Sequence, residues 1–169
     1  MKRFVSTYLP EGSPPVSVLD VGSQDVNGTY RPLFDQEGWI YTGLDMAEGP
    51  NVDIAPRDPY SWPMLQDQSF DVVISGQALE HVEFFWLTVQ EMARVLKPGG
   101  LLCLVAPSSG YEHRYPVDCW RFYPDGMRAL AKYAQLEVLE AYAQWDEADT
   151  GRDPVWQDCV LVARKPLGT

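Results

Sequence analysis

The sequence contains no apolar run that approaches the roughly 18 residues needed to cross a membrane. Its opening residues, Met1 to Phe4, also lack the apolar core of a secretory signal peptide. We therefore expect a cytoplasmic protein with no membrane partner.

Cysteine is scarce, with three residues at positions 103, 119 and 159. An odd number of cysteines without metal-site spacing argues against a disulfide framework and against a cysteine-bound metal. We expect no metal ion and reduced thiols. Cys103 and Cys159 fall within apolar runs, so both are predicted to be small core residues.

Basic residues are also few. The chain has 13 Lys and Arg against 24 Asp and Glu, which gives a formal net charge of −11 with no basic cluster. Proteins that bind nucleic acid need a basic surface to neutralise phosphates. We therefore expect no nucleic-acid partner.

What remains is the composition of one globular domain, predicted to span residues 1–169. The 46% hydrophobic and 22% charged residues suit a sheet covered on both faces. Apolar strand-like runs alternate with amphipathic segments, which predicts an α/β fold with a doubly wound, mostly parallel sheet.

One stretch organises the chain. Residues 16–21 form a short apolar run that ends at Gly22, and residues 29–37 are predicted to begin a helix. Strand, glycine turn and helix together place a nucleotide at the carboxyl end of a sheet. Asp45 follows the next predicted strand, 40–44, at the position of a ribose-binding acid. The full Gly-x-Gly-x-x-Gly motif is absent, because Gln24 and Val26 stand where glycines would be expected.

The remaining elements follow in order. Residues 1–15 offer little for an N-terminal helix, and Trp62 suits either the core or stacking on a purine ring. Helices are predicted at 84–97 and from Pro124, and further strands at 52–54, 69–75, 101–105, 136–145 and 159–164. Two final strands without a helix between them predict that the last strand is antiparallel, after a polar loop at 146–157.

Four motifs in this order resemble the class I S-adenosylmethionine-dependent methyltransferases, in particular small, core-only members of the type 11 kind. They are Val18-Leu19-Asp20-Val21-Gly22, Gly43-Leu44-Asp45, Phe70-Asp71-Val72-Val73 with Ala78-Leu79-Glu80-His81, and Leu96-Lys97-Pro98-Gly99-Gly100. The resemblance covers nearly the whole chain. It implies a Rossmann-like sheet of seven strands with the last reversed, S-adenosyl-L-methionine as cofactor, and methyl transfer.

Carried over by position, the resemblance implies a set of cofactor-binding residues. Gly22 would lie against the methionine moiety, Asp20 would face its ammonium group through water, and Asp45 would bind both ribose hydroxyls. The remaining cofactor-binding candidates are Ser23, Met46, Asp58 (near the adenine, with Asp53 as second choice), and Ser75, Gly76 and Gln77 beside the sulfonium. His81 is interpreted as structural.

The acceptor is expected at the polar and aromatic stretch after the strand at 101–105, because ligands bind outside the carboxyl ends of strands. His113 is the predicted general base, with Asp118 as runner-up. Trp120 and Phe122 are predicted to form an apolar platform. The predicted acceptor-binding residues are Tyr111, Arg114, Trp120 and Arg121. The alternative is that this cluster only braces the following helix.

Residues 25–28 and 115–122 resemble a subset of this methyltransferase family that is linked with glycan or secondary-metabolite pathways. This resemblance suggests a small-molecule or carbohydrate-like acceptor, methylated at a hydroxyl. A rival hypothesis is a non-catalytic cofactor-binding subunit of a larger enzyme, and a homodimer or partner subunit stays open. A nicotinamide-dependent oxidoreductase is a second rival, disfavoured by the degenerate glycine turn.

Overall fold

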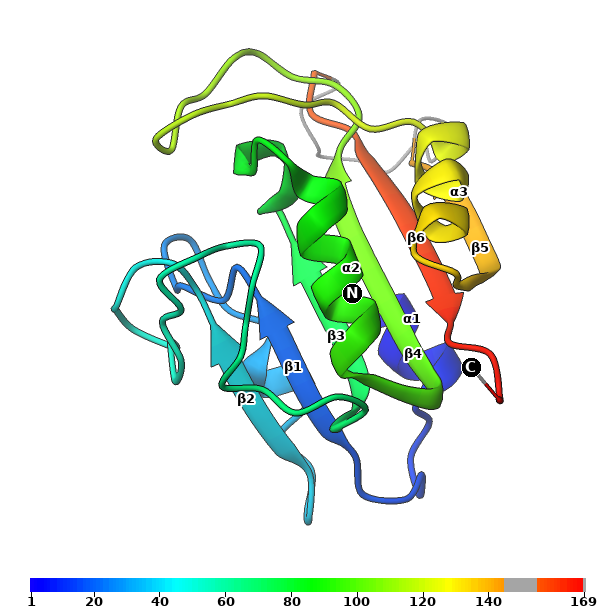
Figure 1. Cartoon of the computed structure of the whole chain (residues 1–169). Helices are drawn as coiled ribbons and strands as arrows, with labels where there is room; N and C mark the ends of the chain where they lie inside the picture. The colour runs from blue at the N-terminus through cyan, green and yellow to red at the C-terminus, as the bar shows by residue number, and fades with distance from the viewer. Residues whose placement is uncertain (145–154, 169) are drawn as a thin grey trace.

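The computed structural model describes residues 1–144 and 155–168 and forms a six-stranded mixed sheet (Figure 1). The strand order is β2-β1-β3-β4-β6-β5. Strands β1 to β4 pair in parallel, whereas β6 runs antiparallel to both of its neighbours. The reversed last strand is therefore confirmed. The strands are β1 Ser17–Val21, β2 Ile40–Leu44, β3 Phe70–Gly76, β4 Leu96–Pro107, β5 Glu137–Ala143 and β6 Asp158–Arg164.

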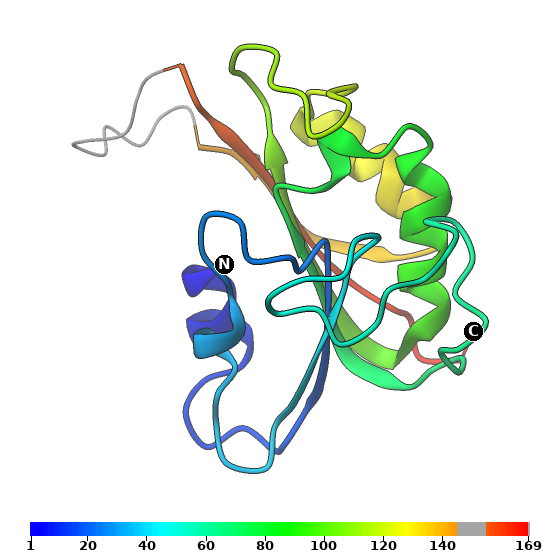
Figure 2. The same ribbon diagram turned by 90° about the vertical axis from the view of Figure 1, so that its left-hand side faces the viewer.

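Three α-helices and two short 3₁₀ turns cover the sheet unevenly. Helices α2 and α3 lie on one face and α1 lies on the other (Figure 2). The elements are α1 Lys2–Tyr8, η1 Arg31–Leu33, η2 Leu79–His81, α2 Phe85–Val95 and α3 Pro124–Tyr133. No helix among the described residues is long and apolar enough to cross a membrane.

The central strand β4 shows why the sheet is buried on both sides. Successive side chains of a strand point to opposite faces. Leu102 and Leu104 pack with α2 and α3, whereas Cys103 and Val105 pack on the face that carries α1. Cys103 and Cys159 are both buried, so their predicted core positions are confirmed.

The seventh strand expected at residues 52–54 does not form. A single parallel bridge, Leu44 to Ile54, is all that pairs this segment with β2. Asn51 has a positive φ of 67° and precedes the bridge, while Pro56 follows it. Because proline has no N–H to donate, the pairing cannot continue past it.

Two predictions about helices are also wrong, one of a helix that does not form and one of a segment that was not expected to be helical. The segment 29–37 forms only the 3₁₀ turn η1, where the Arg31 side chain bonds Asn51 and Asp53 instead of covering the sheet as part of a helix. Conversely, α1 forms where little helix was expected. Its only buried residue, Phe4, packs against the sheet, so a tertiary contact stabilises a helix too short to be stable alone. Part of the predicted loop at 146–157 lies outside the described residues.

Candidate active site

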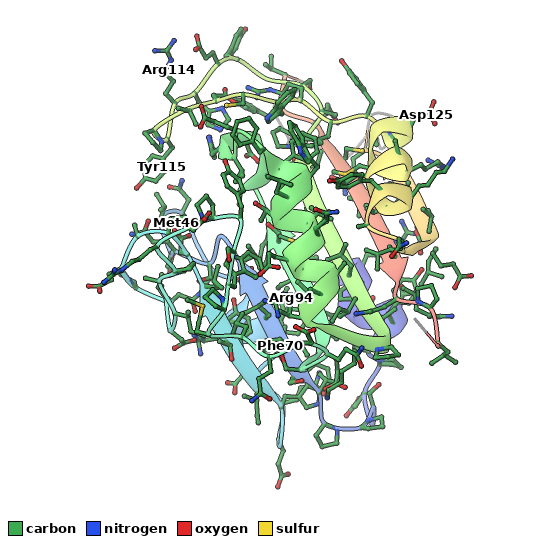
Figure 3. All side chains as sticks on the ribbon, viewed as in Figure 1. Met46, Phe70, Arg94, Arg114, Tyr115 and Asp125 are labelled. Atoms are coloured by element: carbon green, nitrogen blue, oxygen red, sulfur yellow. The ribbon has the colours of Figure 1, made fainter. Side chains whose placement is uncertain are left out.

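A cavity of about 340 Å³ opens at the carboxyl ends of β1, β2 and β3. Its apolar wall includes Val21, Leu44 and Leu79. Met46, from the loop after β2, and Tyr115, from the loop after β4, both line it, and Figure 3 shows them on the same side of the molecule. Segments distant in sequence therefore meet at the edge of the sheet where α/β proteins bind ligands.

Gly22 forms the sharp turn at the end of β1. It has a φ of 80°, and a Cβ there would lie 2.3 Å from the Cβ of Ala78. The N–H groups of Gly22 and Ser23 both donate to the Leu44 carbonyl, at 2.8 and 3.1 Å. Only glycine fits this conformation and this close approach, so the bare backbone forms part of the cavity wall.

Asp45 is half-buried and lines the cavity directly after β2. Its two carboxylate oxygens each accept one backbone N–H, from Gln24 at 3.1 Å and from Ala47 at 3.2 Å. No other residue that the structure describes bonds this carboxylate. Each oxygen keeps acceptor capacity, so Asp45 can accept hydrogen bonds from a ligand.

Asp20 takes a different position from the one expected. It does not line the cavity; its carboxylate accepts a hydrogen bond from the Tyr41 hydroxyl, and its Oδ1 has no described partner. Burial raises the pKa of Asp20 to about 6, although the Tyr41 hydrogen bond opposes the shift. Asp20 is thus a buried acid behind the cavity rather than a group on its surface.

The other predicted cofactor residues divide into two groups. Ser75 and Gln77 line the cavity with Gly22, Asp45 and Met46. The Ser75 hydroxyl donates to the Val21 carbonyl at 2.7 Å and ties the end of β3 to β1. Gln77 reaches across to Asp158, with its amide nitrogen 2.8 Å from the carboxylate.

Three predicted residues besides Asp20 lie outside the cavity lining. The Ser23 hydroxyl donates to the Asn51 carbonyl at 3.0 Å, and Asp58 caps its own turn by accepting the Tyr60 N–H at 2.8 Å. Gly76 is covered by the Tyr30 ring, which a Cβ on Gly76 would approach to 2.4 Å. Sequence reasoning missed this contact because Tyr30 and Gly76 are brought together only by the fold.

Trp62 belongs to the hydrophobic core. It is 1% exposed and packs in the cluster beneath α2 and α3 while forming one wall of the cavity. Almost no ring surface is accessible for stacking on a purine. The core interpretation is therefore the one that the structure supports.

Asp118 is held by Arg121 in the loop after β4. The guanidinium donates to both carboxylate oxygens at 2.6 and 2.8 Å, and the His113 N–H adds a third bond at 2.7 Å. The Arg121 hydrogen bond holds the pKa of Asp118 well below its usual range. A carboxylate so stabilised is a poor base, which disfavours the runner-up role given to Asp118; that role stays a prediction. Arg121 also donates to the Tyr111 carbonyl at 2.7 Å, which braces the loop.

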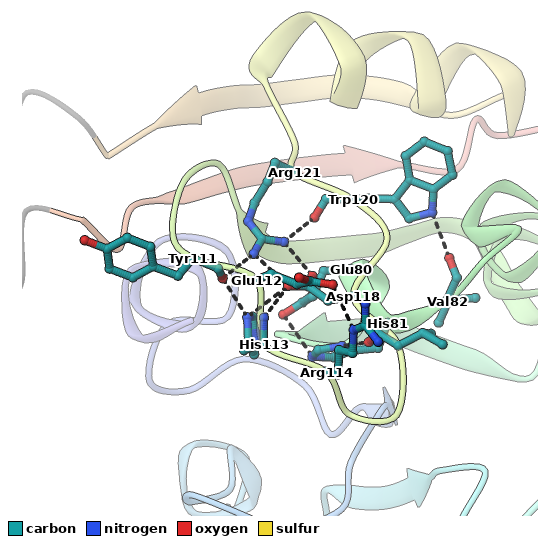
Figure 4. Close-up of polar contacts among 11 residues, drawn as sticks. Glu80, His81, Val82, Tyr111, Glu112, His113, Arg114, Asp118, Trp120 and Arg121 are labelled. Atoms are coloured by element: carbon teal, nitrogen blue, oxygen red, sulfur yellow. Dashed lines mark hydrogen bonds and ion pairs between the residues drawn. The ribbon is translucent and has the colours of Figure 1, made fainter.

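The predicted base His113 lies in a cluster with His81 and Glu80 (Figure 4). The two imidazole rings meet edge to face, with centroids 5.0 Å apart. His81 lines the cavity, so the expectation that it would not face the cleft is wrong, and its structural role stays an interpretation. Glu80 is fully buried, and that burial raises its pKa to about 7.

The residues predicted to bind the methyl acceptor are exposed or bonded elsewhere in the fold. Tyr111 is 71% exposed, and Arg114 extends into solvent on an ion pair with Glu112 at 2.8 Å. The Trp120 indole N–H donates to the Val82 carbonyl at 3.1 Å, and Phe122 is buried, so the predicted two-ring platform is wrong. None of these residues lines the cavity; Tyr115 and Pro116 do.

A larger cavity of about 620 Å³ lies on the opposite face of the sheet, between α1 and strands β4, β5 and β6. It results from the sparse cover on that face rather than from strand ends that converge. The smaller cavity holds the glycine turn and the cavity-facing acid, so we take it as the candidate active site.

The chain is similar in sequence to known methyltransferases. A family described as a methyltransferase domain matches residues 19–104, about half of the chain. A curated, uncharacterized methyltransferase from Mycobacterium bovis is 32% identical over 139 residues, which cover 72% of this chain and 52% of that protein. The chain thus spans about half the length of the curated relatives it matches.

Two solved structures share the fold. Burkholderia thailandensis 1,6-didemethyltoxoflavin-N1-methyltransferase, bound to 1,6-didemethyltoxoflavin and S-adenosylhomocysteine, has a TM-score of 0.75 at 16% identity, covering 98% of this chain and 76% of that one. A methyltransferase in complex with the Haloferax volcanii Trm112 methyltransferase activator has a TM-score of 0.65 at 22% identity, covering 89% and 83%. At these identities the likeness concerns the fold.

Proposed function

The chain belongs to the class I S-adenosylmethionine-dependent methyltransferase family, and from this premise we propose that it transfers a methyl group to a small-molecule or glycan-type acceptor, at a hydroxyl. The observation that carries the proposal is the pairing of the Gly22 turn with Asp45 in one cavity at the strand ends. We propose this cavity as the binding site for S-adenosylmethionine.

The residues present fit that cofactor. The cavity of about 340 Å³ is within the roughly 300–1,000 Å³ typical of small-molecule sites. Gly22 leaves bare backbone where a side chain would otherwise stand, and Asp45 offers acceptors to a pair of ribose hydroxyls. The apolar wall of Leu44, Trp62 and Leu79 suits an adenine ring edge and a thioether chain.

When bound, the cofactor supplies an electrophilic methyl group on a sulfonium, so the protein need only align the acceptor and exclude water. Gly22 and Asp45 would hold the cofactor from the β1 and β2 side. Ser75 would act indirectly, because its hydroxyl donates its hydrogen bond to the Val21 carbonyl. This bond would keep the floor of the cavity rigid. Tyr115 and His81 line the cavity from the acceptor side.

A hydroxyl acceptor also requires a group that takes its proton. His113 remains our candidate, because its imidazole is 42% exposed and adjoins His81 beside the cavity. Asp118 and Arg121 would fix the loop that presents it. Tyr111 and Arg114 would meet only an acceptor large enough to extend beyond the cavity.

A second candidate function is a cofactor-binding subunit of a larger enzyme. The specific observation in its favour is that the chain spans about half of its curated relatives, so residues needed for turnover can lie elsewhere. Formation of S-adenosylhomocysteine above the acceptor-free rate, with a panel of sugars and phenols, supports an enzyme.

Substitution of Asp45 tests the cofactor site. Asp45→Asn removes the charge that strengthens the ribose hydrogen bonds, and each charged bond contributes about 1.5–3 kcal/mol. Titration calorimetry should therefore show S-adenosylmethionine and S-adenosylhomocysteine binding weakened by roughly 10- to 100-fold.

Glu48→Gln is the matched control, since it removes an exposed acid of the same loop that lies outside the cavity lining. Its affinity for S-adenosylmethionine and S-adenosylhomocysteine should equal that of the unaltered protein. Equal affinity for Asp45→Asn would contradict the ribose assignment, and NAD binding in place of S-adenosylmethionine would contradict the proposed function.

A further inference from the structure

Both histidines of the chain lie in one cluster with a buried carboxylate. One potential ligand atom from each of Glu80, His81 and His113 lies within 4.8 Å of the other two. Glu80 and His81 follow β3, whereas His113 arrives on the loop after β4 (Figure 4). This convergence is a product of the fold, and no sequence spacing indicates it.

We propose that Glu80, His81 and His113 bind one divalent transition-metal cation, such as Zn²⁺, on the acceptor side of the cavity. The sequence predicted no metal, so the site is an addition to the proposed function rather than part of it.

Glu80 supplies the first line of evidence. Its side chain is 0% exposed, and neither carboxylate oxygen has a hydrogen-bond partner from another described residue. The His81 Nε2 lies 3.7 Å from Oε1, and the charge of Arg121 also acts favourably on this carboxylate. A buried carboxylate without partners is costly, and a cation would supply the missing interaction.

The histidine tautomers supply the second line of evidence for this site. The His81 Nδ1 lies 2.5 Å from the Val117 carbonyl oxygen, which can only accept. Nδ1 must therefore carry a proton, and in the neutral ring the lone pair is then on Nε2, the nitrogen near Glu80. A ring nitrogen that donates to a backbone carbonyl while the other binds metal is the usual arrangement of metal-ligating histidines.

The same tautomer argument applies to His113. Its Nδ1 lies 3.4 Å from the Tyr111 carbonyl and 3.3 Å from Asp118 Oδ2, and both are acceptors. Its Nε2 is then the nitrogen with a free lone pair. Asp118 would orient this histidine as carboxylates commonly orient zinc ligands.

The surrounding charges favour a cation. Arg121 is the positive group of the cluster, but its two terminal nitrogens are engaged by Asp118 and by the Tyr111 and Trp120 carbonyls. Arg121 and Asp118 cancel in charge, so an ionised Glu80 leaves one unit of negative charge. A divalent cation would neutralise it and leave one unit of positive charge in the cluster.

The ligand set selects the kind of metal. Two imidazoles and one carboxylate suit first-row transition metals, and three protein ligands leave open coordination positions. Ligands of one tetrahedral Zn²⁺ stand roughly 3.3 Å apart, so separations of up to 4.8 Å need to shorten by up to about 1.5 Å. The half-exposed His113 on its loop can provide that movement.

The consequence for chemistry rests on the proposed function. A cation with open positions beside His81 would coordinate an acceptor hydroxyl and lower its pKa, and the proton would pass to bulk water at the exposed His113 side. The resulting alkoxide or phenoxide oxygen would then attack the methyl group. With a cation bound, His113 is a ligand and not the base.

Zn²⁺ binding to the chelator-treated, dialysed protein tests the site directly. Competition with a chromogenic chelator should show one high-affinity equivalent. Since the chain has only two histidines, both imidazole Nε2 ¹⁵N resonances should shift at one equivalent. Glu80→Gln and His113→Ala should each weaken binding by at least about tenfold.

Glu112→Gln is the matched control, because this exposed acid neighbours His113 but pairs with Arg114. Its Zn²⁺ affinity should be unchanged. His113→Ala alters an exposed loop and should keep the melting temperature of the metal-free protein, so loss of binding there cannot be ascribed to unfolding. Absence of a bound equivalent, or equal affinity for Glu80→Gln and His113→Ala, would overturn the inference.

The two proposals fail separately. S-adenosylmethionine binding without any Zn²⁺ site would remove the metal and leave the proposed function intact. A Zn²⁺ site without S-adenosylmethionine binding would remove the proposed function and leave the metal.

Discussion

Individual acidic residues in this protein differ widely in their environments. Asp118 is ionised and held by a guanidinium fork, Asp45 accepts two backbone N–H groups at the cavity, and Asp20 is buried against a tyrosine hydroxyl. Their chemistry follows from these partners and not from their shared side chain. Asp45 is suited to ligand binding, Asp118 to bracing, and Asp20 to holding a proton near pH 6.

Asp20 predicts a pH-dependent stability for the cofactor-free protein. Its folded pKa of about 6 exceeds the unfolded value of about 3.9, so between these values the folded state keeps a proton that the unfolded chain has lost. The contribution of Asp20 to the free energy of unfolding should fall as pH rises through this window, by at most about 1.4 kcal/mol per pH unit. Asp20→Asn should remove that component, so urea titrations from pH 4 to 7 should show the variant gaining relative stability with pH.

Asp71→Asn provides a control of opposite sign. Burial raises the pKa of Asp71, but hydrogen bonds from Lys97 and Ser17 outweigh it and leave the pKa below its usual value. The stability that Asp71 contributes is therefore present above the unfolded pKa of about 3.9 and is lost as pH falls through the folded pKa, so the titrations of this control extend below pH 4. A stability difference for Asp20→Asn that is constant with pH would contradict the prediction.

At the scale of elements, the site depends on loops that leave β1, β2, β3 and β4 at one edge of the sheet. The β1 turn contacts the segment after β3, since a Cβ on Gly22 would touch Ala78. The β4 loop is joined to the same segment by the Cys119 N–H, which donates to the Glu80 carbonyl at 2.7 Å. These contacts make the four loops one unit.

Gly22→Ala should break that unit. The added Cβ would lie 2.3 Å from Ala78, at a φ of 80° that side chains rarely adopt. We expect about 1–3 kcal/mol of lost stability by urea denaturation, together with loss of S-adenosylmethionine affinity. Gly126→Ala in α3 meets nothing within 4 Å and should instead stabilise the protein by roughly 0.5–1 kcal/mol. Equal unfolding midpoints for the two variants would argue against this role of the turn.

At the scale of the whole molecule, the net charge and the unequal helical cover of the two sheet faces determine which partners the surface can bind. The formal net charge is −11, and Arg31, Arg94, Lys97 and Arg121 are engaged by neighbouring carboxylates. One face of the sheet carries two long helices, whereas the other carries α1 and the 3₁₀ turn η1 over a cavity of about 620 Å³. Neither feature offers a continuous basic surface.

The whole-molecule charge predicts no useful affinity for nucleic acid. Fluorescence anisotropy with duplex DNA and structured RNA at physiological salt should show no binding tighter than about 10 μM. Repulsion between phosphates and an acidic protein is the reason. Sub-micromolar binding that weakens with added salt would refute this prediction.

Local sequence was sufficient to predict the elements that a local signal encodes. The apolar runs of β1, β3 and β4 and the amphipathic spacing of α2 identified the fold, and the Gly22 turn followed by Asp45 identified two residues that line the cavity. Strand and helix periodicities depend on neighbouring residues, so they can be read without knowing the fold.

Only the tertiary structure decided how the residues after β3 and β4 are arranged and partnered. His113 and Asp118 were both candidates in sequence, and Arg121 separated them by holding Asp118 as an ion. The proximity of Glu80 and His81 to His113 depends on two loops from adjacent parallel strands meeting at one edge. Burial and partnering of this kind are properties of contacts between distant segments, and no local pattern encodes them.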